Sequence, residues 1–168
     1  MSHSLVYYGN ETLAAVAERV VNVDGEVVSL VHEMFDIMYK ERGIGLAAPQ
    51  IDVGKRIIVI DTGDDRDGRL ALINPEIKAF SDNLEPYEEG CLSVPRLLAD
   101  VVRPTEILIK GISVKGEEVE FEASGLMARV LQHEIDHLDG ILFIDRIEKY
   151  IKDEFRAELK KIKKLNKQ

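Results

Sequence analysis

The stretch Gln132-His133-Glu134-Ile135-Asp136-His137 contains an HExxH motif inside an apolar run. Two histidines at this spacing lie one above the other on a helix face, about 6 Å apart, so that both imidazoles reach one metal ion. The glutamate between them projects from a neighbouring side of the helix, where it acts on a water bound to that metal. The motif therefore predicts a hydrolytic metal site on a helix and leaves its third ligand open.

The third ligand is sought first downstream of the motif. One known extension, HExxHxxGxxH, returns a third histidine after a glycine turn, and here Gly140 fits but Phe143 stands at the last position. The remaining histidines, His3 and His32, lie near the N-terminus. A carboxylate from a later helix is an alternative, although that segment is Lys-rich and amphipathic, as is typical of a surface helix. Its candidates are Glu148, Glu154 and Glu158.

The single cysteine, Cys91, lies in residues 88–95 (EEGCLSVP). A lone cysteine is commonly an inert buried hydrophobic residue. Here a glycine precedes it, a proline follows and an acidic pair lies upstream, which indicates a shaped loop or the end of a strand. One thiol excludes a disulfide framework and a CxxC zinc knuckle. Together with two histidines it would form a three-ligand catalytic site with one open position.

Residues 43–50 (GIGLAAPQ) form an uncharged segment rich in glycine and alanine. Such a segment is typical of a tight apolar turn, and its small residues allow another backbone to come close. It is not a phosphate loop, because it has no GxGxxG pattern and no Lys-Ser/Thr follows it. Gln50 would place a neutral amide donor beside the approaching backbone.

Taken together, GIGLAAPQ, EGCLS and QHEIDH, in this order and at these separations, resemble the motifs of peptide deformylase. The resemblance extends from about Val6 to about Ile147. It implies a metal-dependent hydrolase that removes the N-formyl group from the N-terminal formyl-methionine of newly synthesised proteins and releases formate. N-formyl-methionyl nascent polypeptides are therefore the expected partners.

The resemblance also implies a role for each matching residue. The implied metal ligands are Cys91, His133 and His137. Glu134 would be the general acid/base, and the Gln50 amide and the backbone N–H of Leu92 would be oxyanion donors. The backbone of Gly45 would face the formyl group, and Glu89 would pair with Arg103. The implied substrate-binding residues are Gly43, Ile44, Gly45, Glu89 and Gly90.

The metal is expected from both donor chemistry and the resemblance. Thiolate and imidazole suit zinc and iron alike. The resemblance implies Fe²⁺ as the active metal, with Zn²⁺, Ni²⁺ or Co²⁺ able to occupy the site.

Two positions depart from the family pattern. Residues 9–14 (GNETLA) replace a Pro-Asp-Pro-x-Leu-Arg run, which predicts only a local change near the N-terminus. Leu98 stands where some bacterial members carry a basic residue that binds the substrate backbone. This departure leaves the substrate contacts beyond the first residue open.

Two other functions compete with deformylation. An HExxH-type metallopeptidase is disfavoured by Phe143 at the third-histidine position and by the presence of Cys91. A non-catalytic metal-binding module is disfavoured by Glu134, since a structural site has no use for a base and is closed by a fourth protein ligand.

Length and composition predict one domain over residues 1–168, because 168 residues with 45% hydrophobic content can bury an ordinary core, and the resemblance implies that this domain is catalytic. No apolar run is long enough to span a membrane and no signal peptide is recognised, so a cytoplasmic protein is expected. The net charge of −9 argues against a nucleic-acid substrate.

Predicted strands grouped before a central HExxH helix favour an α+β fold over a parallel α/β sheet, and mixed or antiparallel sheets packed around that helix are expected. Residues 24–42 carry a helical stripe capped by Asp24. Ser124 is expected to cap the HExxH helix, and Gly140 to end it. The predicted strands are residues 57–60, 71–77, 106–112 and 118–121, with a hairpin turn at 115–116.

Residues 149–168 carry eight Lys or Arg against three Asp or Glu, which predicts a basic, amphipathic C-terminal helix. Its apolar stripe consists of Ile151, Phe155, Leu159, Ile162 and Leu165. A docked helix with a solvated basic face is the favoured interpretation. The sharper hypothesis is a contact with the phosphates of ribosomal RNA.

Three further charged residues lie on or beside the HExxH motif. Asp136 and Asp139 flank the second histidine and are interpreted as helix-surface charge in preference to partners of a metal ligand. Arg129, one turn before His133, is assigned no catalytic role.

Overall fold

The computed structural model describes residues 3–64 and 69–167. Its helices are α1 (Gly25–Lys40), α2 (Gly125–Leu138), α3 (Lys149–Glu154) and α4 (Arg156–Lys164), with short 3-10 helices η1 (Ala48–Ile51), η2 (Phe143–Asp145) and η3 (Leu165–Lys167). Its strands are β1 (Gly45–Ala47), β2 (Ile57–Asp61), β3 (Arg69–Phe80), β4 (Leu84–Cys91), β5 (Val94–Pro104), β6 (Glu106–Ile112) and β7 (Glu118–Ser124).

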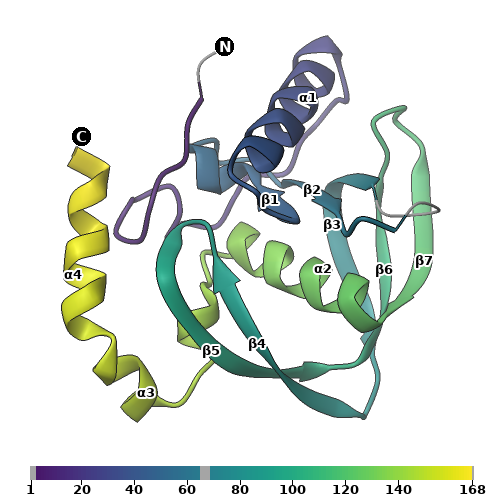
Figure 1. The fold of residues 1–168 in the computed structure, drawn as a ribbon. Coiled ribbons are helices and arrows are strands. Elements are labelled where there is room, and N and C mark those ends of the chain that lie inside the picture. The colour runs from purple at the N-terminus through teal and green to yellow at the C-terminus, as the bar shows by residue number, and fades with distance from the viewer. Residues whose placement is uncertain (1–2, 65–68, 168) are drawn as a thin grey trace.

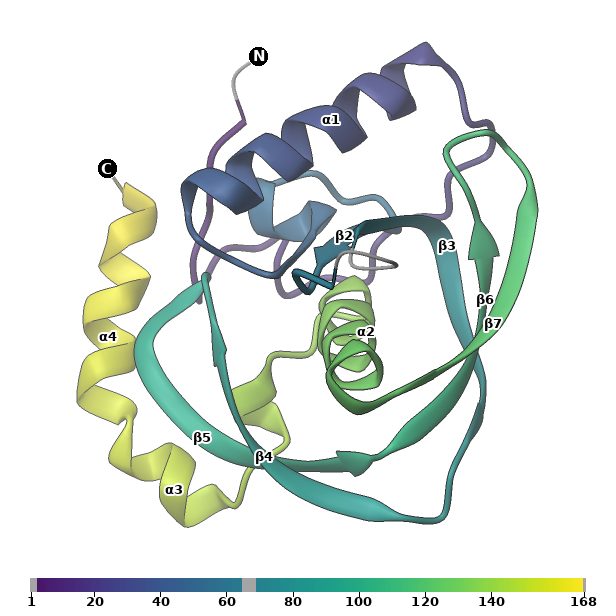
Figure 2. The same ribbon diagram turned by 45° about the vertical axis from the view of Figure 1, so that its right-hand side comes forward.

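The strands form two antiparallel sheets, which confirms the α+β prediction. The larger sheet has the order β1-β2-β3-β6-β7, and β4 pairs with β5 in a separate hairpin. Helix α2, which carries the HExxH motif, lies between the larger sheet and this hairpin (Figures 1 and 2). Every residue from Val130 to Leu138 is buried, so α2 is the central helix that the sequence predicted.

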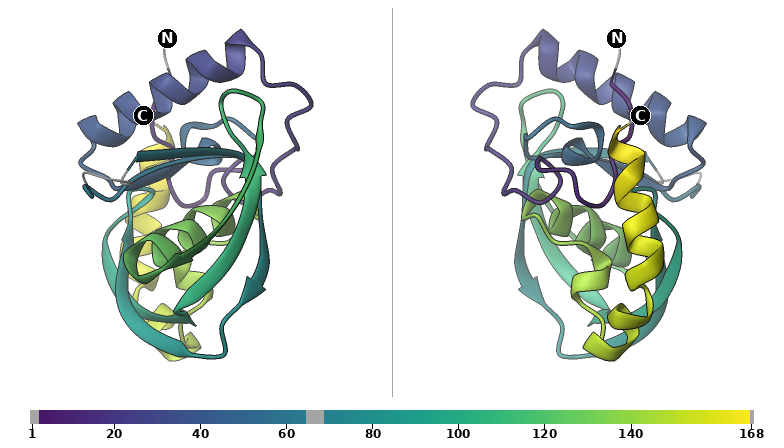
Figure 3. Two further views of the ribbon diagram at one scale, coloured as in Figure 1. Left: turned by 90° about the vertical axis from the view of Figure 1, so that its right-hand side faces the viewer. Right: turned by 90° about the vertical axis from the view of Figure 1, so that its left-hand side faces the viewer.

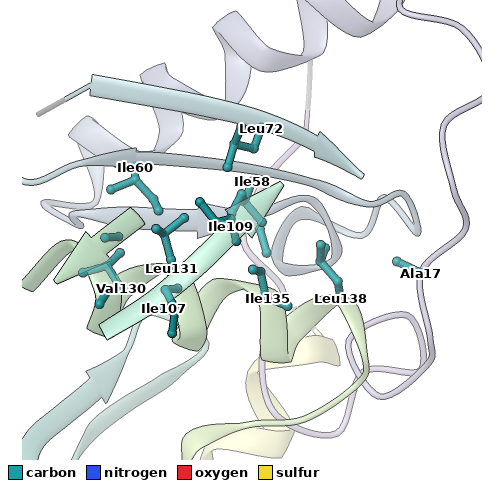
Figure 4. Close-up of a cluster of buried hydrophobic side chains, with 13 residues drawn as sticks. Ala17, Ile58, Ile60, Leu72, Ile107, Ile109, Val130, Leu131, Ile135 and Leu138 are labelled. Atoms are coloured by element: carbon teal, nitrogen blue, oxygen red, sulfur yellow. The ribbon is translucent and has the colours of Figure 1, made fainter. Parts of the chain in front are cut away.

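Strand β2 is buried on both of its faces, and this explains its uninterrupted apolar sequence. Ile58 and Ile60 pack toward α2, in a cluster with Leu131 and Ile135 (Figure 4). Ile57 and Val59 point the other way and join a cluster with α1. The alternation of side chains along a strand thus places one helix on each face of the sheet.

Helix α1 forms where the sequence predicted it. Asp24 is the N-cap residue, and its carboxylate accepts a hydrogen bond of 3.0 Å from the amide of Val27. The buried face consists of Val27, Val31, Met34, Phe35 and Met38. Ser124 also stands at the N-cap of α2, but its side chain makes no capping hydrogen bond.

The C-terminal segment is docked, as favoured from the sequence. Leu159 and Ile162 are buried in a cluster that includes Val94 and Val101 of β5. The side chain of Asn166 binds the backbone of Tyr7 and so ties the two ends of the chain together (Figure 3). The segment is two helices rather than one, because its backbone tightens at Phe155, whose amide bonds to Lys152 three residues back.

The β4–β5 hairpin is the main element that the sequence did not predict. Its outward positions are polar or exposed, and a run such as residues 84–91 (LEPYEEGC) has no clear strand pattern. Its expected feature at Cys91, the end of a strand, is present. Gln168 of the predicted C-terminal helix lies outside the described residues. No helix within the described ranges has the length and apolar character needed to cross a membrane.

Gly140 ends the HExxH helix, as predicted, by means that only glycine provides. Its φ is +74°, a region that disfavours residues with a side chain. A Cβ atom there would lie 2.5 Å from the carbonyl oxygen of Ala14. The turn after α2 therefore packs directly on the backbone of the N-terminal segment.

We predict that Gly140→Ala lowers the free energy of unfolding by more than about 2 kcal/mol, since strain and a backbone clash act together. Gly116→Ala is the matched control: Gly116 also has a positive φ of +80° but nothing within 4 Å of its Cβ position. That variant should lose only about 1 kcal/mol. Urea unfolding measures both, and equal losses would contradict the role given to the contact with Ala14.

Candidate metal centre

Cys91 is placed at the end of β4, where the hairpin turns. It pairs with Val94 of β5 after a register shift between Glu89 and Cys91. The Sγ atom lies 3.4 Å from Nε2 of His137 on α2. The turn of the hairpin thus brings the thiol onto the polar face of the central helix.

Cys91, His133 and His137 form the single group of potential metal ligands found among the described residues, and their ligand atoms all lie within 4.8 Å of one another. The rings of the two histidines are 5.0 Å apart between centroids. One thiolate and two imidazoles suit zinc or iron. Three protein ligands leave one position of a tetrahedral site open, which is the pattern of catalytic rather than structural sites.

The orientation of His133 is set by a carboxylate. Its Nδ1 lies 2.9 Å from Oε1 of Glu89, so Nε2 is the nitrogen left for a metal. Nδ1 of His137 is buried and has no hydrogen-bond partner among the residues described. Of the two Nδ1 atoms, only that of His133 is therefore held by a side chain among the residues described.

Burial and neighbouring charge act differently on the two imidazoles. For His133, burial opposes protonation, but hydrogen bonds with Cys91 and Glu89 outweigh it and raise the pKa well above its ordinary value. For His137, burial and the nearby charge of His133 lower the pKa well below that value. A metal ligand must be unprotonated, so His137 is prepared for that role by its environment alone.

Glu89 is held ionised between arginines. Arg103 donates to both of its carboxylate oxygens, at 2.6 and 3.0 Å, which confirms the expected pairing. Arg129 adds a third hydrogen bond at 2.9 Å. Burial alone would raise the pKa of Glu89, but the hydrogen bonds from His133 and Arg103 hold it well below its usual range.

The interpretation of Asp136 as helix-surface charge was wrong. Asp136 is 7% exposed, and it binds Arg103 at 2.9 Å and Arg146 at 2.6 and 2.8 Å. The sequence did not reveal that α2 is buried on all sides from Val130 to Leu138, so that a polar residue there needs internal partners. Asp139 lies at the end of the helix, where it pairs with Arg56.

Glu134 is also buried, but its pKa is shifted in the direction opposite to that of Glu89. It is 4% exposed, and its Oε1 has no partner among the described residues. Burial in this environment raises the pKa of its carboxyl to about 7. A Cβ atom on Gly45 would lie 2.6 Å from Oε2 of Glu134, so the glycine is what allows β1 to pass this carboxylate.

Gln50 directs its amide nitrogen at the thiol. Its Oε1 accepts a hydrogen bond of 2.9 Å from the amide of Ala47, which fixes the orientation of the side chain. Its Nε2 then lies 3.6 Å from Sγ of Cys91 and 3.3 Å from Oγ of the fully buried Ser93. A neutral, oriented N–H donor therefore stands beside the ligands.

These groups open onto one cavity of about 570 Å³. Every site residue predicted from the sequence lines this cavity except His137, which is fully buried. The predicted residues in its lining are Gly43, Ile44, Gly45, Gln50, Glu89, Gly90, Cys91, Leu92, His133 and Glu134. Exposed apolar side chains surround its mouth, namely Ile44, Tyr87, Leu98 and Leu126.

Phe143, which occupies the place of a third histidine, has a packing role. Its side chain is 1% exposed, and its ring stacks on that of His133 at 6.3 Å between centroids. The carboxylates considered as alternative ligands, Glu148, Glu154 and Glu158, are not in the metal-ligand group found among the described residues.

Several residues that support the site were not predicted from the sequence. Ser93 holds Gln50, Arg129 binds Glu89 and Arg146 binds Asp136. A signal existed for Asp136, because it follows His133 by three positions and so shares its side of a helix. Nothing in the sequence around Arg146 pointed to its partner.

Comparison with known proteins places this geometry in a family. The family model described as polypeptide deformylase matches residues 2–153. A peptide deformylase of Brachyspira hyodysenteriae is 48% identical over 168 residues, covering 97% of this chain and 90% of that protein. One from Picosynechococcus is 50% identical over 149 residues, covering 88% of this chain and 80% of that protein.

Solved structures of peptide deformylases are also similar to the structure of this chain. The crystal structure of a peptide deformylase from Legionella pneumophila superimposes with a TM-score of 0.90 at 38% identity, and covers 100% of this chain and 99% of that one. A peptide deformylase from Synechococcus elongatus, solved in complex with actinonin, gives a TM-score of 0.87 at 39% identity, over 93% of this chain and 87% of that one.

The pKa of Glu134 predicts a pH-dependent cost to the stability of the metal-free protein. The folded pKa of about 7 exceeds the ordinary value of 4.5 for a glutamate carboxyl, so folding favours the protonated form. Stability relative to a permanently neutral side chain is therefore full below about pH 4.5 and is lost as pH rises toward 7. Glu134→Gln should stabilise the metal-free protein by up to about 3 kcal/mol above pH 7, and much less at pH 4.5.

Thermal unfolding across pH 4.5–8 measures this difference. Glu122→Gln, at an exposed position on β7, is the matched control and should leave the profile unchanged. A stability difference between Glu134→Gln and the parent protein that does not vary with pH would contradict the assignment.

Proposed function

This chain belongs to the polypeptide deformylase family, and from that premise we propose that it removes the N-formyl group from formyl-methionyl nascent polypeptides and releases formate. The observation that carries this proposal is the convergence of the ligand atoms of Cys91, His133 and His137 beside a cavity that Glu134 and Gln50 also line. We take residues 1–168 as one catalytic domain acting in the cytoplasm, where such chains emerge.

We propose that the three ligands hold Fe²⁺ as the active metal, with Zn²⁺, Ni²⁺ or Co²⁺ able to occupy the same donors, because thiolate and imidazole suit these ions. When bound, such an ion supplies Lewis acidity and lowers the pKa of a coordinated water toward about 7. Glu89 contributes by holding His133 with its Nε2 directed away from the carboxylate.

Glu134 is the proposed general acid/base. Its carboxyl is buried at the cavity, and a pKa of about 7 lies near the pH at which it must both accept and release a proton. It takes a proton from the attacking water at Oε1, which has no hydrogen-bond partner among the described residues, and gives it to the leaving amine. The bond broken is the amide C–N of the formyl group, and the products are formate and a free N-terminus.

Two N–H groups are the proposed oxyanion donors. Attack on the formyl carbon places negative charge on its oxygen, and Nε2 of Gln50 and the backbone N–H of Leu92 would stabilise it. Gln50 suits this role because it is fixed by Ala47 and carries no charge of its own. Loss of one such donor typically costs about 2.7–4 kcal/mol of barrier.

Close backbone packing supports selection of a formyl group. Gly45 passes Glu134 with no room for a Cβ atom, and its backbone would face the formyl group. Gly43 and Gly90 have Leu92 and Leu98 at 2.7 Å from their Cβ positions. A formyl carbon bears only hydrogen, so it fits where the larger acyl group of a peptide bond does not.

The alternative of an HExxH metallopeptidase finds no support in the contacts of Phe143. That residue packs on His133 rather than supplying a third imidazole, and Cys91 lies at the position a ligand needs. The family relationship points the same way.

The basic face of the C-terminal helix is the proposed contact with ribosomal RNA. Leu159 and Ile162 dock the helix, so its cations face outward. Lys160, Lys161 and Lys164 are exposed, and none of them forms an ion pair among the described residues. Unpaired cations on a fixed helix are suited to the phosphates of RNA.

The enzymatic proposal is tested by formate release from formyl-Met-Ala-Ser, using protein prepared without oxygen and loaded with Fe²⁺, Ni²⁺ or Co²⁺. Glu134→Gln should keep its metal and lose activity by about 10²–10⁴-fold, the usual contribution of a general acid/base. Glu122→Gln should stay active. Absence of activity in every metal-loaded form of the parent protein would refute the function, and loss of metal from Glu134→Gln would refute the role of Glu134.

The ribosome contact is tested by co-sedimentation with ribosomes at increasing salt. Replacing Lys160, Lys161 and Lys164 by glutamate should abolish binding at about 0.15 M salt while leaving deformylation of a short formyl peptide unchanged. The matched control reverses three exposed lysines elsewhere, namely Lys40, Lys55 and Lys115. Equal binding by the two triple variants would refute a contact through the helix.

A further inference from the structure

We propose that Arg146 is a positioning residue for the metal ligand His133, acting through Asp136, Arg103 and Glu89. This inference rests on the proposed metal-dependent function and extends it to a residue at the surface of the protein. The side chain of Arg146 is 43% exposed, and its hydrogen bonds within the described residues go to Asp136 and to none of the three ligands. Its effect must therefore be carried by the groups between.

The contacts form one unbroken series from the surface to the ligand. Arg146 binds Asp136 at 2.6 and 2.8 Å. Asp136 binds Arg103 at 2.9 Å, and Arg103 binds both oxygens of Glu89 at 2.6 and 3.0 Å. Glu89 then lies 2.9 Å from Nδ1 of His133. Charges alternate along the series, so each member is fixed by partners of opposite sign.

Arg146 is needed because Arg103 holds only one oxygen of Asp136. That contact, at Oδ2, would leave the carboxylate free to rotate about its own bond. Arg146 donates to both Oδ2 and Oδ1, and this bidentate interaction fixes the plane of the carboxylate. The position of Arg103, and with it that of Glu89, follows from this plane.

Burial makes the series rigid. The side chains of Glu89 and Arg103 are each 4% exposed, so water does not compete for their hydrogen bonds. Arg146 directly follows η2, whose Phe143 stacks on the ring of His133. This part of the chain therefore acts on His133 in two ways. Phe143 contacts its ring directly, and Arg146 is linked to it through the charged series.

The experiment measures metal affinity, because a merely structural role would not change it. Co²⁺ and Zn²⁺ are titrated into metal-free protein against a competing chelator, for the parent, Arg146→Gln and Arg156→Gln. Arg156 is the matched control, since its side chain is 71% exposed and pairs only with the surface residue Asp153 among the residues described. Thermal midpoints of the metal-free forms are recorded alongside.

Arg146→Gln should weaken metal binding about 3- to 10-fold, at or below the low end for partners that touch a ligand directly. In an Asp136→Asn background the same substitution should add nothing, because the series is already interrupted. Arg146→Lys keeps the positive charge but loses the bidentate contact with Asp136, and should weaken metal binding about 2-fold. This variant provides the test if Arg146→Gln does not fold.

The proposal is overturned if Arg146→Gln binds metal as tightly as Arg156→Gln, even if its thermal midpoint falls. It is also overturned if the substitution weakens binding equally in the Asp136→Asn background. Neither measurement uses a formylated substrate, so failure here is distinguishable from failure of the proposed deformylase activity.

Discussion

The burial of helix α2 between the larger sheet and the β4–β5 hairpin is the constraint on which this structure depends. One side of the helix supplies apolar contacts to the sheet, through residues such as Leu131 and Ile135. The other side carries His133, Glu134 and Asp136, which are also buried. Burying a polar group costs free energy unless it is paired, and the surrounding chain brings partners to His133 and Asp136.

The two buried carboxylates that line the cavity, those of Glu89 and Glu134, have pKa values shifted in opposite directions. Glu89 is surrounded by Arg103, Arg129 and His133, and its pKa lies well below the usual range. Glu134 is also buried, but no cation among the described residues forms a hydrogen bond with it, and burial raises its pKa to about 7. One group is thereby fixed as a permanent anion that orients a ligand. The other is free to exchange a proton, and pairs of groups separated in this way are typical of acid/base sites.

The residues around the ligands are organised by backbone approach as much as by side chains. Gly45 lets β1 pass Glu134 at a distance that no other residue allows, and Gly140 lets the turn after α2 pack on Ala14. The hairpin turn brings Cys91 to the helix, where the amide nitrogen of Gln50 lies within hydrogen-bonding distance of the Cys91 thiol and the Ser93 hydroxyl. Since these approaches come from four different parts of the chain, the site forms only when the whole fold does.

The sequence by itself determined the local chemistry. The spacing of His133 and His137 requires a helix to bring them together. The periodic apolar stripe predicts α1, and the short continuous apolar run predicts β2. The GIGLAAPQ and EGCLS segments supplied the remaining site residues through resemblance. The tertiary structure decided what surrounds them. Asp136 has the same local sequence whether α2 is exposed or buried, and its pairing with Arg103 and Arg146 depends on contacts between segments distant in the chain. Such pairings leave no periodic signal, because they are set by how elements pack rather than by how each one forms.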